Sequence, residues 1–222
     1  MKECCIVIPT HKSKLDKDET VSIKTLFKYL SDYDIYTVSY SKDNHIQGTD
    51  LKIYDEVWFS TYRNQNKFRL TVDFYEQFID YKYMLIYETD SLVFSKNLTF
   101  WIDLNYDYIG APWLISDATN HSRVKDKTVG NGGFCLRNIS KSLEILKDKR
   151  IANLISIYNR NEDHFWSEVV PTLFNFKIPD WYIALNFSFE VDPRKWYNIL
   201  EKLPFGCHGW NRYDKEFWLE VL

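Results

Sequence analysis

Cysteine is scarce in the sequence, and its spacing excludes the common cysteine-based sites. The four cysteines are Cys4, Cys5, Cys135 and Cys207. No two of them stand in a C-x-x-C pattern, which argues against a zinc knuckle and against a thioredoxin-like redox pair. A reducing compartment is therefore the simpler expectation, because disulfides form mainly in oxidising compartments.

Long hydrophobic runs are also missing. The first apolar run extends from Cys4 to Pro9, which is too short for the core of a signal peptide or for a membrane span. We therefore expect a cytoplasmic protein without a transmembrane segment. Peripheral association with a membrane stays open, because attachment through a partner leaves no trace in the sequence.

Neither sign of charge dominates. The 28 lysine and arginine residues nearly balance the 31 aspartate and glutamate residues, and the formal net charge is −3. Nucleic acid is therefore not expected as a partner. Repeats, low-complexity tracts and linkers rich in glycine or serine are absent too, and 222 residues suffice for one substantial core. We expect a single domain over residues 1–222, and the sequence leaves its oligomeric state open.

The hydrophobic pattern of the first half alternates between strands and helices. Short apolar runs predict buried strands, and apolar positions at helical spacing predict helices. The expected strands are Cys4–Pro9, Ile35–Tyr40, Tyr54–Ser60 and Met84–Tyr87; the expected helices follow Asp18 and Asn64, the second with Phe68, Val72, Tyr75 and Ile79 on one face. This order is typical of a wound α/β sheet whose parallel strands are joined by crossovers. In the second half, Ser140 and Asn161 are expected to cap two further helices.

Two carboxylates follow the fourth expected strand. Glu88 and Asp90 are separated by one residue, so alternation places both on the same side of the strand at its carboxyl end. Ligands bind at that edge of an open α/β sheet. Two hard oxygen donors suit a divalent cation such as Mg²⁺ or Mn²⁺. Taken alone, the pair is explained equally well as an acidic turn that ends the strand.

Glycine is rare, yet three of the seven glycines lie in the loop Gly130-Asn131-Gly132-Gly133. Their spacing matches neither the Walker nor the dinucleotide-binding motif. Such a cluster allows close approach of a sugar or a phosphate to the backbone, with a plain loop as the alternative. Upstream, the run Tyr-Asp-Tyr-Ile-Gly-Ala-Pro-Trp ends at Trp113 and fits either a ligand-contacting segment or a tight turn with a core tryptophan.

Two later segments carry polar side chains that suit chemistry. Glu162 and Asp163 open an expected helix, where acids commonly interact with the helix dipole. Alternatively, Asp163 is a general base that removes a proton from an attacking hydroxyl. His208 lies between small residues near the C-terminus. A lone histidine usually forms only hydrogen bonds, but this imidazole could complete the coordination of a metal held by carboxylates.

Taken in order, these segments resemble the GT-A-fold glycosyltransferase superfamily, and more closely a bacterial and phage-associated family of proposed sugar transferases known mainly as a domain of unknown function. The shared features are a Phe-Tyr-x-x-Phe helix, a Leu-Ile-Tyr strand ending in a D-x-D-like site, Tyr-Asp-Tyr-Ile-Gly-Ala-Pro-Trp, Gly-Asn-Gly-Gly-Phe, Glu-Asp-x-Phe-Trp and Pro-Phe-Gly-x-His. All of them occur in that order between Phe74 and Trp210. The resemblance implies a GT-A-like α/β fold, an open twisted sheet flanked by helices.

The resemblance also implies a metal-bound donor. The donor is a nucleotide-diphosphate sugar, most readily a UDP-sugar, and the metal is Mn²⁺ or Mg²⁺. By position, Asp90 becomes the main metal ligand and His208 a further one. Glu88, whose position is often an amide in relatives, either joins them or binds a ribose hydroxyl or a metal-bound water. Asp163 takes the position of the base in inverting members, with Glu162 as its catalytic neighbour.

Other positions carry over to the substrates. Pro9 and Thr10, at the end of the first strand, contribute to the donor site. Gly132 and Gly133 line the donor sugar, and Trp113 lies on the acceptor side. Three cations before the central strand could pair with phosphate oxygens, although solvated surface charge explains them more simply. They are Arg63, Lys67 and Arg69.

The sequence therefore predicts a metal-dependent glycosyltransferase that moves a sugar, with inversion, to a hydroxyl of a saccharide, glycan or lipid-linked acceptor. A nucleotidyltransferase or phosphohydrolase would use the same acids and metal on a nucleoside triphosphate. A non-catalytic glycan-binding module would use the aromatic cleft alone.

Overall fold

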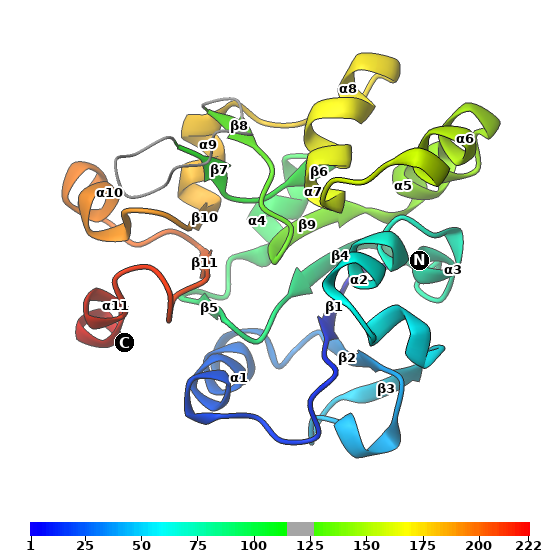
Figure 1. The fold of residues 1–222 in the computed structure, drawn as a ribbon. Coiled ribbons are helices and arrows are strands. Elements are labelled where there is room, and N and C mark those ends of the chain that lie inside the picture. The colour runs from blue at the N-terminus through cyan, green and yellow to red at the C-terminus, as the bar shows by residue number, and fades with distance from the viewer. Residues whose placement is uncertain (115–126) are drawn as a thin grey trace.

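A twisted mixed sheet lies at the centre of the computed structural model, which describes residues 1–114 and 127–222 (Figure 1). Its six strands follow the order β3-β2-β1-β4-β9-β6. Their bounds are β1 Lys2–Pro9, β2 Asp34–Ser39, β3 Asp50–Ile53, β4 Tyr81–Tyr87, β6 Tyr108–Ile109 and β9 Phe134–Asn138. The first four strands of the chain run parallel, as predicted, whereas β9 is antiparallel to both β4 and β6.

Two smaller sheets complete the strand content of the described residues. One has the order β10-β11-β5, and the other pairs β7 with β8. Their bounds are β5 Ser91–Val93, β7 Pro112–Trp113, β8 Thr128–Val129, β10 Ser188–Phe189 and β11 Gly206–His208. Because β5 follows β4 after only three residues, the small sheet containing β5 continues from the carboxyl end of the central strand.

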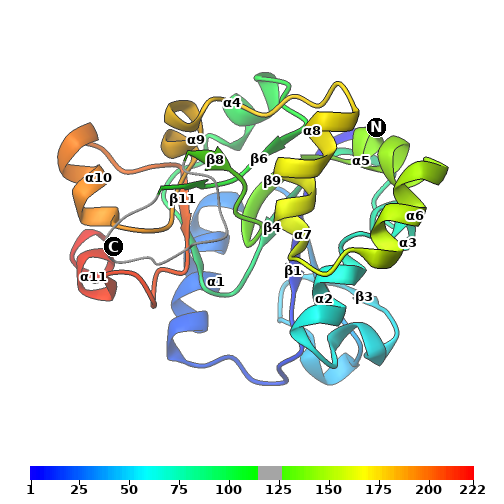
Figure 2. The ribbon, with the colours of Figure 1, turned by 45° about the horizontal axis from the view of Figure 1, so that its top comes forward.

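Helices flank the central sheet (Figure 2). They are α1 Lys17–Leu30, α2 Tyr62–Phe68, α3 Val72–Glu76, α4 Leu98–Asp103, α5 Ile139–Leu146, α6 Lys149–Ile157, α7 Glu162–His164, α8 Val170–Leu173, α9 Trp181–Phe187, α10 Pro193–Leu200 and α11 Lys215–Val221. Two 3₁₀ turns, η1 Lys42–Asn44 and η2 Glu56–Phe59, and one π-helical segment, η3 Phe165–Val169, complete the list. Within the described ranges, no helix is both long and apolar enough to cross a bilayer.

Alternation along β1 divides the hydrophobic core into two layers. Cys5 and Val7 face a cluster that includes residues of α2, α3, α5 and α6. Cys4, Ile6 and Ile8 face the opposite cluster, with residues of α1, α4 and α9. Both faces of the central strands are therefore covered, which explains why these strands appear in the sequence as continuous apolar runs.

Helix α1 begins with two reciprocal hydrogen bonds. The Asp16 side chain accepts from the backbone N–H of Glu19 at 2.9 Å, and the Glu19 side chain accepts from the backbone N–H of Asp16 at 2.9 Å. This capping box satisfies two N–H groups that would otherwise lack partners. The predicted first strand, first helix, second strand and fourth strand are all confirmed, to within a few residues at their ends.

The predicted strand Tyr54–Ser60 is wrong. The third strand, β3, comes earlier, and the 3₁₀ turn η2 occupies most of the predicted segment. The Asp55 side chain accepts from the backbone N–H of Val57 at 2.9 Å and begins this turn. A local side-chain bond of this kind competes with strand pairing, so it outweighs the β-forming tendency of the aromatic residues.

The single helix predicted after Asn64 is two short helices, α2 and α3. Thr61, rather than Asn64, caps α2, and Thr71 caps α3. Ile79 lies beyond both helices, and 56% of its surface is exposed.

The caps predicted in the second half also need correction. Asn138, rather than Ser140, caps α5. Asn161 does stand at the N-cap position of α7, but without a side-chain capping bond.

Candidate active site

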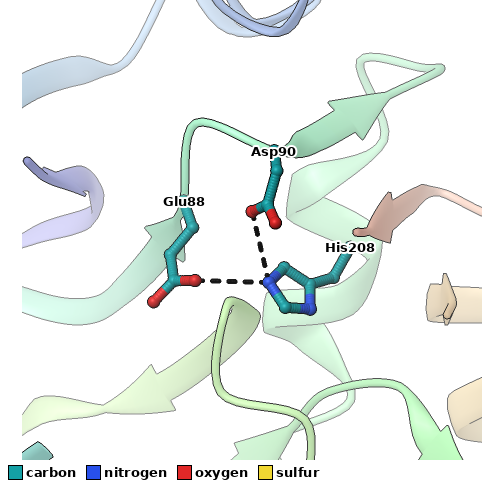
Figure 3. Close-up of side chains that lie close together, drawn as sticks. All are labelled: Glu88, Asp90 and His208. Atoms are coloured by element: carbon teal, nitrogen blue, oxygen red, sulfur yellow. Dashed lines mark hydrogen bonds and ion pairs between the residues drawn. The ribbon is translucent and has the colours of Figure 1, made fainter. Parts of the chain in front are cut away.

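Three potential metal ligands converge where the central sheet meets the small one. Glu88 follows β4, Asp90 precedes β5, and His208 ends β11. Because β11 pairs antiparallel with β5, His208 stands opposite Ser91, one residue after Asp90. The three side chains point toward one another (Figure 3), and one ligand atom of each lies within 4.8 Å of the others. The predicted grouping of Glu88, Asp90 and His208 is therefore present in the geometry.

The distances within this cluster suit a small cation. His208 Nε2 lies 3.2 Å from Glu88 Oε2 and 3.3 Å from Asp90 Oδ1. Two carboxylates and one imidazole form a donor set that Mn²⁺ accepts well, and Mg²⁺ can use the carboxylates. The residues present therefore fit a divalent metal.

Charge shifts the pKa of every member of the cluster. Burial lowers the pKa of His208, but the carboxylates of Asp90, Glu190 and Glu88 outweigh it, so the pKa lies well above its usual 6.5. Burial raises the pKa of Glu88, yet Arg69 and His208 bring it far below its usual value. The pKa of Asp90 is also lowered, because His208 outweighs the cost of burial. Both acids are thus ionised at neutral pH and available to a cation.

Arg69 belongs to this site, so its interpretation as solvated surface charge is wrong. Its guanidinium forms an ion pair with Glu88 and lies 3.6 Å from Glu162 Oε1, and only 10% of its side chain is exposed. Arg63 is exposed, as that interpretation predicted. The ion pair with Arg69 occupies one oxygen of Glu88, which leaves the other oxygen, Oε2, for His208 or a metal.

The glycine loop packs directly against the histidine. A Cβ atom at Gly133 would overlap His208 Nε2, so only glycine lets the imidazole come this close. The Asn131 side chain holds the loop in place, because its Oδ1 accepts from the backbone N–H of Gly133 at 3.0 Å and of Phe134 at 3.3 Å. The loop is therefore a fitted wall of the site rather than a plain connection.

Glu162 and Asp163 are neighbours in very different environments. Glu162 is 1% exposed, and its Oε1 accepts from Arg137 Nη2 at 2.8 Å. Asp163 has no cationic partner at hydrogen-bonding distance in the described chain; its Oδ1 accepts from the backbone N–H of His164 at 2.8 Å. Burial and the charge of Glu162 raise the pKa of Asp163 to about 7. A carboxylate with that pKa can accept a proton near neutral pH.

The other oxygen of Glu162, Oε2, is buried and has no hydrogen-bond partner within residues 1–114 and 127–222. A buried polar atom of this kind is costly unless a ligand or a water satisfies it.

Two adjoining cavities open onto the metal ligands. The first, of about 260 Å³, is lined by Glu88, Trp113, Gly132, Gly133, Glu162, Asp163 and His208 among others. The second, of about 350 Å³, is lined by Pro9, Thr10, Glu88 and Asp90 among others. Both cavities include Tyr62, Gln65, Arg69, Glu88 and Arg212 in their walls. Every residue that the sequence assigned to the site lines one or both cavities.

Trp113 forms one wall of the first cavity. Its ring stacks on that of His164, with 4.4 Å between centroids and 28° between planes. A Cβ atom at Gly130 would overlap the Trp113 ring, so this glycine makes room for it. The tryptophan is 8% exposed, so little of its ring surface is open to the cavity.

Four site residues were not predicted from the sequence. They are Asn131, Arg137, Glu190 and Arg212. Arg212 Nη2 lies 2.7 Å from Asp90 Oδ2 and 3.3 Å from His208 Nε2. Asn131 lies inside the glycine motif and Arg212 four residues after His208, so their proximity to predicted residues was a usable signal. Arg137 likewise lies four residues after Gly133, whereas Glu190 lies 18 residues before His208 and gave no such signal.

A family model covers most of the chain. The model described as "Protein of unknown function (DUF5672)" matches residues 48–208. A search among curated proteins finds no match to this chain.

Solved structures that share the fold are glycosyltransferases. The galactosyltransferase LgtC, in complex with donor and acceptor sugar analogues, is 13% identical over 98% of this chain and 94% of its own, with a TM-score of 0.58. The glycosyltransferase GlyE of Streptococcus pneumoniae TIGR4 is 16% identical over 99% of this chain, with a TM-score of 0.57, and this chain spans 60% of it. A glycosyltransferase involved in glycosylation of the major capsid of PBCV-1 is 17% identical over 99% of this chain and 100% of its own, with a TM-score of 0.55. These similarities confirm the predicted GT-A fold.

Proposed function

The chain belongs to the family described as "Protein of unknown function (DUF5672)", and we propose that it is a metal-dependent glycosyltransferase. In this proposal a sugar passes from a nucleotide diphosphate, most readily UDP, to a hydroxyl of a saccharide, glycan or lipid-linked acceptor. The observation that carries the proposal is the Glu88, Asp90 and His208 cluster, which opens to a cavity that also contains Asp163, an acid with no cationic partner among the described residues.

Asp90 and His208 are the proposed metal ligands. Their donor atoms face each other across 3.3 Å, and Asp90 has a lowered pKa. Glu88 shares its charge with Arg69, so we assign it either as a third ligand through Oε2 or as an acceptor for a metal-bound water. A divalent cation bound here would stabilise the negative charge that develops on the departing diphosphate.

We assign the nucleoside and the sugar of the donor to different cavities. The second cavity, beside Pro9 and Thr10 at the carboxyl end of β1, is the proposed site of the nucleoside. Arg212 lines both cavities, and its guanidinium is about half exposed, so it can turn toward phosphate oxygens. The first cavity takes the sugar, with Gly132 and Gly133 against it.

Asp163 is the proposed base. Its carboxylate would take the proton of the acceptor hydroxyl while the hydroxyl oxygen attacks the anomeric carbon and the bond to the diphosphate breaks. A base on the acceptor side favours attack opposite the leaving group, and therefore inversion. Such proton transfer contributes roughly 10² to 10⁴ in rate. Trp113, in the same cavity wall, would contact the acceptor.

Thermal denaturation with a nucleotide panel tests the donor and metal assignments. UDP, GDP, CDP and dTDP are each added with and without Mn²⁺, and UDP with Mn²⁺ is expected to raise the melting temperature. At 100 times its dissociation constant a ligand adds about 2.7 kcal/mol to the free energy of unfolding. For a chain of this length that is a rise of roughly 5–10 °C.

A pair of aspartate variants makes the test specific. Asp90→Ala should abolish the rise, whereas Asp103→Ala, at an exposed aspartate at the end of α4, should retain it. An unchanged melting temperature with all four nucleotides would remove the donor assignment. Release of pyrophosphate from nucleoside triphosphates without sugar transfer would instead favour a nucleotidyltransferase.

A further inference from the structure

Glu190 lies directly behind the metal-facing histidine. It follows β10, which pairs parallel with β11 so that Phe189 stands opposite Cys207. The next residues along these two strands are Glu190 and His208, and the pairing places them side by side. The Glu190 side chain is 10% exposed, and its Oε1 lies 3.2 Å from His208 Nδ1. The carboxylate therefore contacts the ring nitrogen that faces away from Glu88 and Asp90.

Asn131 fixes the position of that carboxylate. Because Asn131 Oδ1 accepts two backbone N–H groups, the other end of its amide must be the NH₂ group. This Nδ2 donates to Glu190 Oε1 at 2.7 Å and lies 2.9 Å from His208 Nδ1. Glu190 is thus held beside Nδ1 of the His208 ring by Asn131. The same loop places Gly133 against Nε2 of that ring.

A cation that binds at Nε2 displaces the proton there, and the contact with Glu190 keeps the remaining proton of the ring on Nδ1. An ionised carboxylate can only accept hydrogen bonds, so His208 satisfies Glu190 when Nδ1 carries a proton. In the neutral imidazole, Nε2 then has a lone pair directed at Glu88 and Asp90. If Asn131 donated to Nδ1 instead, the neutral ring would carry its proton on Nε2 and could not bind a cation there.

We propose that Glu190 is a positioning residue, which selects the metal-binding tautomer of His208 and fixes the ring so that Nε2 faces the cation. This inference rests on the proposed metal site. Outer carboxylates that accept from a ligating histidine typically contribute 10- to 100-fold to metal affinity. Glu190 itself lies on the far side of the ring and is not one of the three clustered ligands.

The test is the dissociation constant for Mn²⁺ alone, measured on the full chain by electron paramagnetic resonance of the free ion. Glu190→Ala should weaken Mn²⁺ binding by about 10- to 100-fold. Glu190→Gln keeps the shape and a neutral acceptor, so its loss should be smaller but still at least about threefold. Glu216→Gln, which makes the same charge change at an exposed position of α11, should leave the constant unchanged.

Melting temperatures without metal separate positioning from a purely structural role. If Glu190→Ala lowers the metal-free melting temperature but leaves Mn²⁺ affinity within twofold of the wild type, Glu190 is only structural and the proposal is overturned. Equal losses of Mn²⁺ affinity in Glu190→Ala and Glu190→Gln would also overturn it. The loss would then come from the missing charge alone and not from the hydrogen bond to His208 Nδ1. If Glu190→Ala does not fold, Glu190→Gln decides instead: a loss of Mn²⁺ affinity smaller than about threefold overturns the proposal.

Failure of the proposed function gives a different result. In that case the wild-type chain would bind no Mn²⁺, or Asp90→Ala would bind it as well as the wild type. Failure of the Glu190 proposal alone leaves wild-type binding and its dependence on Asp90 intact.

Discussion

Glu162 and Asp163 are adjacent acids, but their different surroundings suit them to different roles. Glu162 is 1% exposed and forms an ion pair with Arg137 at 2.8 Å. Asp163 has no such partner among the described residues, and burial together with the neighbouring negative charge of Glu162 raises its pKa to about 7. Carboxylates whose environments separate their pKa values commonly take different roles in acid–base chemistry. Here Asp163 suits the base, and Glu162 suits a structural role at the start of α7.

The pKa of Asp163 predicts a pH dependence of transfer. Below pH 7 its carboxylate is increasingly protonated and cannot accept the proton of the acceptor hydroxyl, so kcat/KM should fall tenfold per pH unit. Asp163→Asn should retain the melting response to UDP and Mn²⁺ but lose about 10²- to 10⁴-fold in transfer rate. Initial rates between pH 5 and 9, once an acceptor is identified, measure both. Equal activity of Asp163→Asn would reassign the residue to the start of α7.

Asp163 should also lower the free energy of unfolding at neutral pH. The pKa of Asp163 is about 7 in the folded chain, against an ordinary 3.8. The wild type therefore loses stability as the pH rises from about 4 to 7 and remains at the lower value above that. Asp163→Asn should increase the free energy of unfolding at pH 8 by at most about 4 kcal/mol, with little change at pH 4. Urea denaturation at both pH values measures this difference, and a variant less stable than the wild type at pH 8 would contradict the raised pKa.

The two adjacent glycines contact different parts of the site, Gly133 the metal ligands and Gly132 the two acids of α7. A Cβ atom at Gly133 would displace the His208 ring, whereas one at Gly132 would lie 2.6 Å from Glu162 Oε1 and 3.1 Å from the Cβ of Asp163. Gly133→Ala should therefore weaken Mn²⁺ binding at least about tenfold, as expected when a ligand is displaced. Gly132→Ala should bind Mn²⁺ nearly as the wild type does but lose transfer. Identical Mn²⁺ affinities for the two variants would show that the loop yields without moving the histidine.

At the scale of elements, the start of α7 is fixed by β9 and α2 together. Arg137, on β9, is fully buried and donates to Glu162 Oε1, to the Tyr75 hydroxyl at 2.9 Å and to the Cys135 sulfur at 3.1 Å. On α2, Asn66 Oδ1 accepts from the backbone N–H of Glu162 at 2.9 Å. The π-helical segment η3 follows α7 at once, and such segments are frequent at functional sites.

Removing Arg137 should be strongly destabilising. In the described part of the chain, Arg137→Met leaves Glu162 with only the more distant Arg69 as a cationic partner, and breaking one partner of a buried ion pair costs about 3–5 kcal/mol. The double variant Arg137→Met/Glu162→Gln removes the uncompensated charge and should recover at least half of that loss. Lys147→Met, which breaks an exposed ion pair with Glu76, is the matched control and should cost less than about 1 kcal/mol. Chemical denaturation of the wild type, Arg137→Met, Glu162→Gln and the double variant gives the coupling; additive effects would show that the pair does not stabilise the start of α7.

The elements that the sequence predicted correctly are those with strong local signals. α1 has its own capping box, and β1 and β4 are continuous apolar runs buried on both faces. The segment around Tyr54 has an equally strong apolar signal, but a single local bond from Asp55 turns it into η2. The antiparallel placement of β9 could not be predicted, because it depends on pairing with β4 across about fifty residues of sequence.

In the candidate site, too, the residues with a local sequence signal were predicted correctly and those without one were not. Glu88, Asp90 and His208 were predicted because strand ends and a motif order mark them. Arg69 was misassigned, since nothing local distinguishes a buried cation from an exposed one on a short helix. Its two partners, Glu88 and Glu162, are 19 and 93 residues away, and only the folded chain brings them together.

At the scale of the whole molecule, both ends of the chain build the second cavity. Pro9 and Thr10 come from the first strand, and Asn211 and Arg212 come from the segment before the last helix. An ion pair between Lys215 and Asp18, at 2.7 Å, joins α11 to α1 beside it. A nucleotide bound in this cavity would therefore link segments that are about 200 residues apart.

This arrangement predicts the pattern of hydrogen exchange on donor binding. UDP with Mn²⁺ should slow amide exchange in three separate segments: residues 10–16, the glycine loop around Gly132, and the segment around Arg212. At 100 times the dissociation constant the slowing is about hundredfold for amides that exchange only from the free state. The apolar groove lined by Phe100 and Tyr182, which shares no residue with either cavity, is an internal control whose exchange should not change. Protection limited to the first segment would mean that the nucleotide binds without the C-terminal wall, and Arg212 would then have no part in holding the diphosphate.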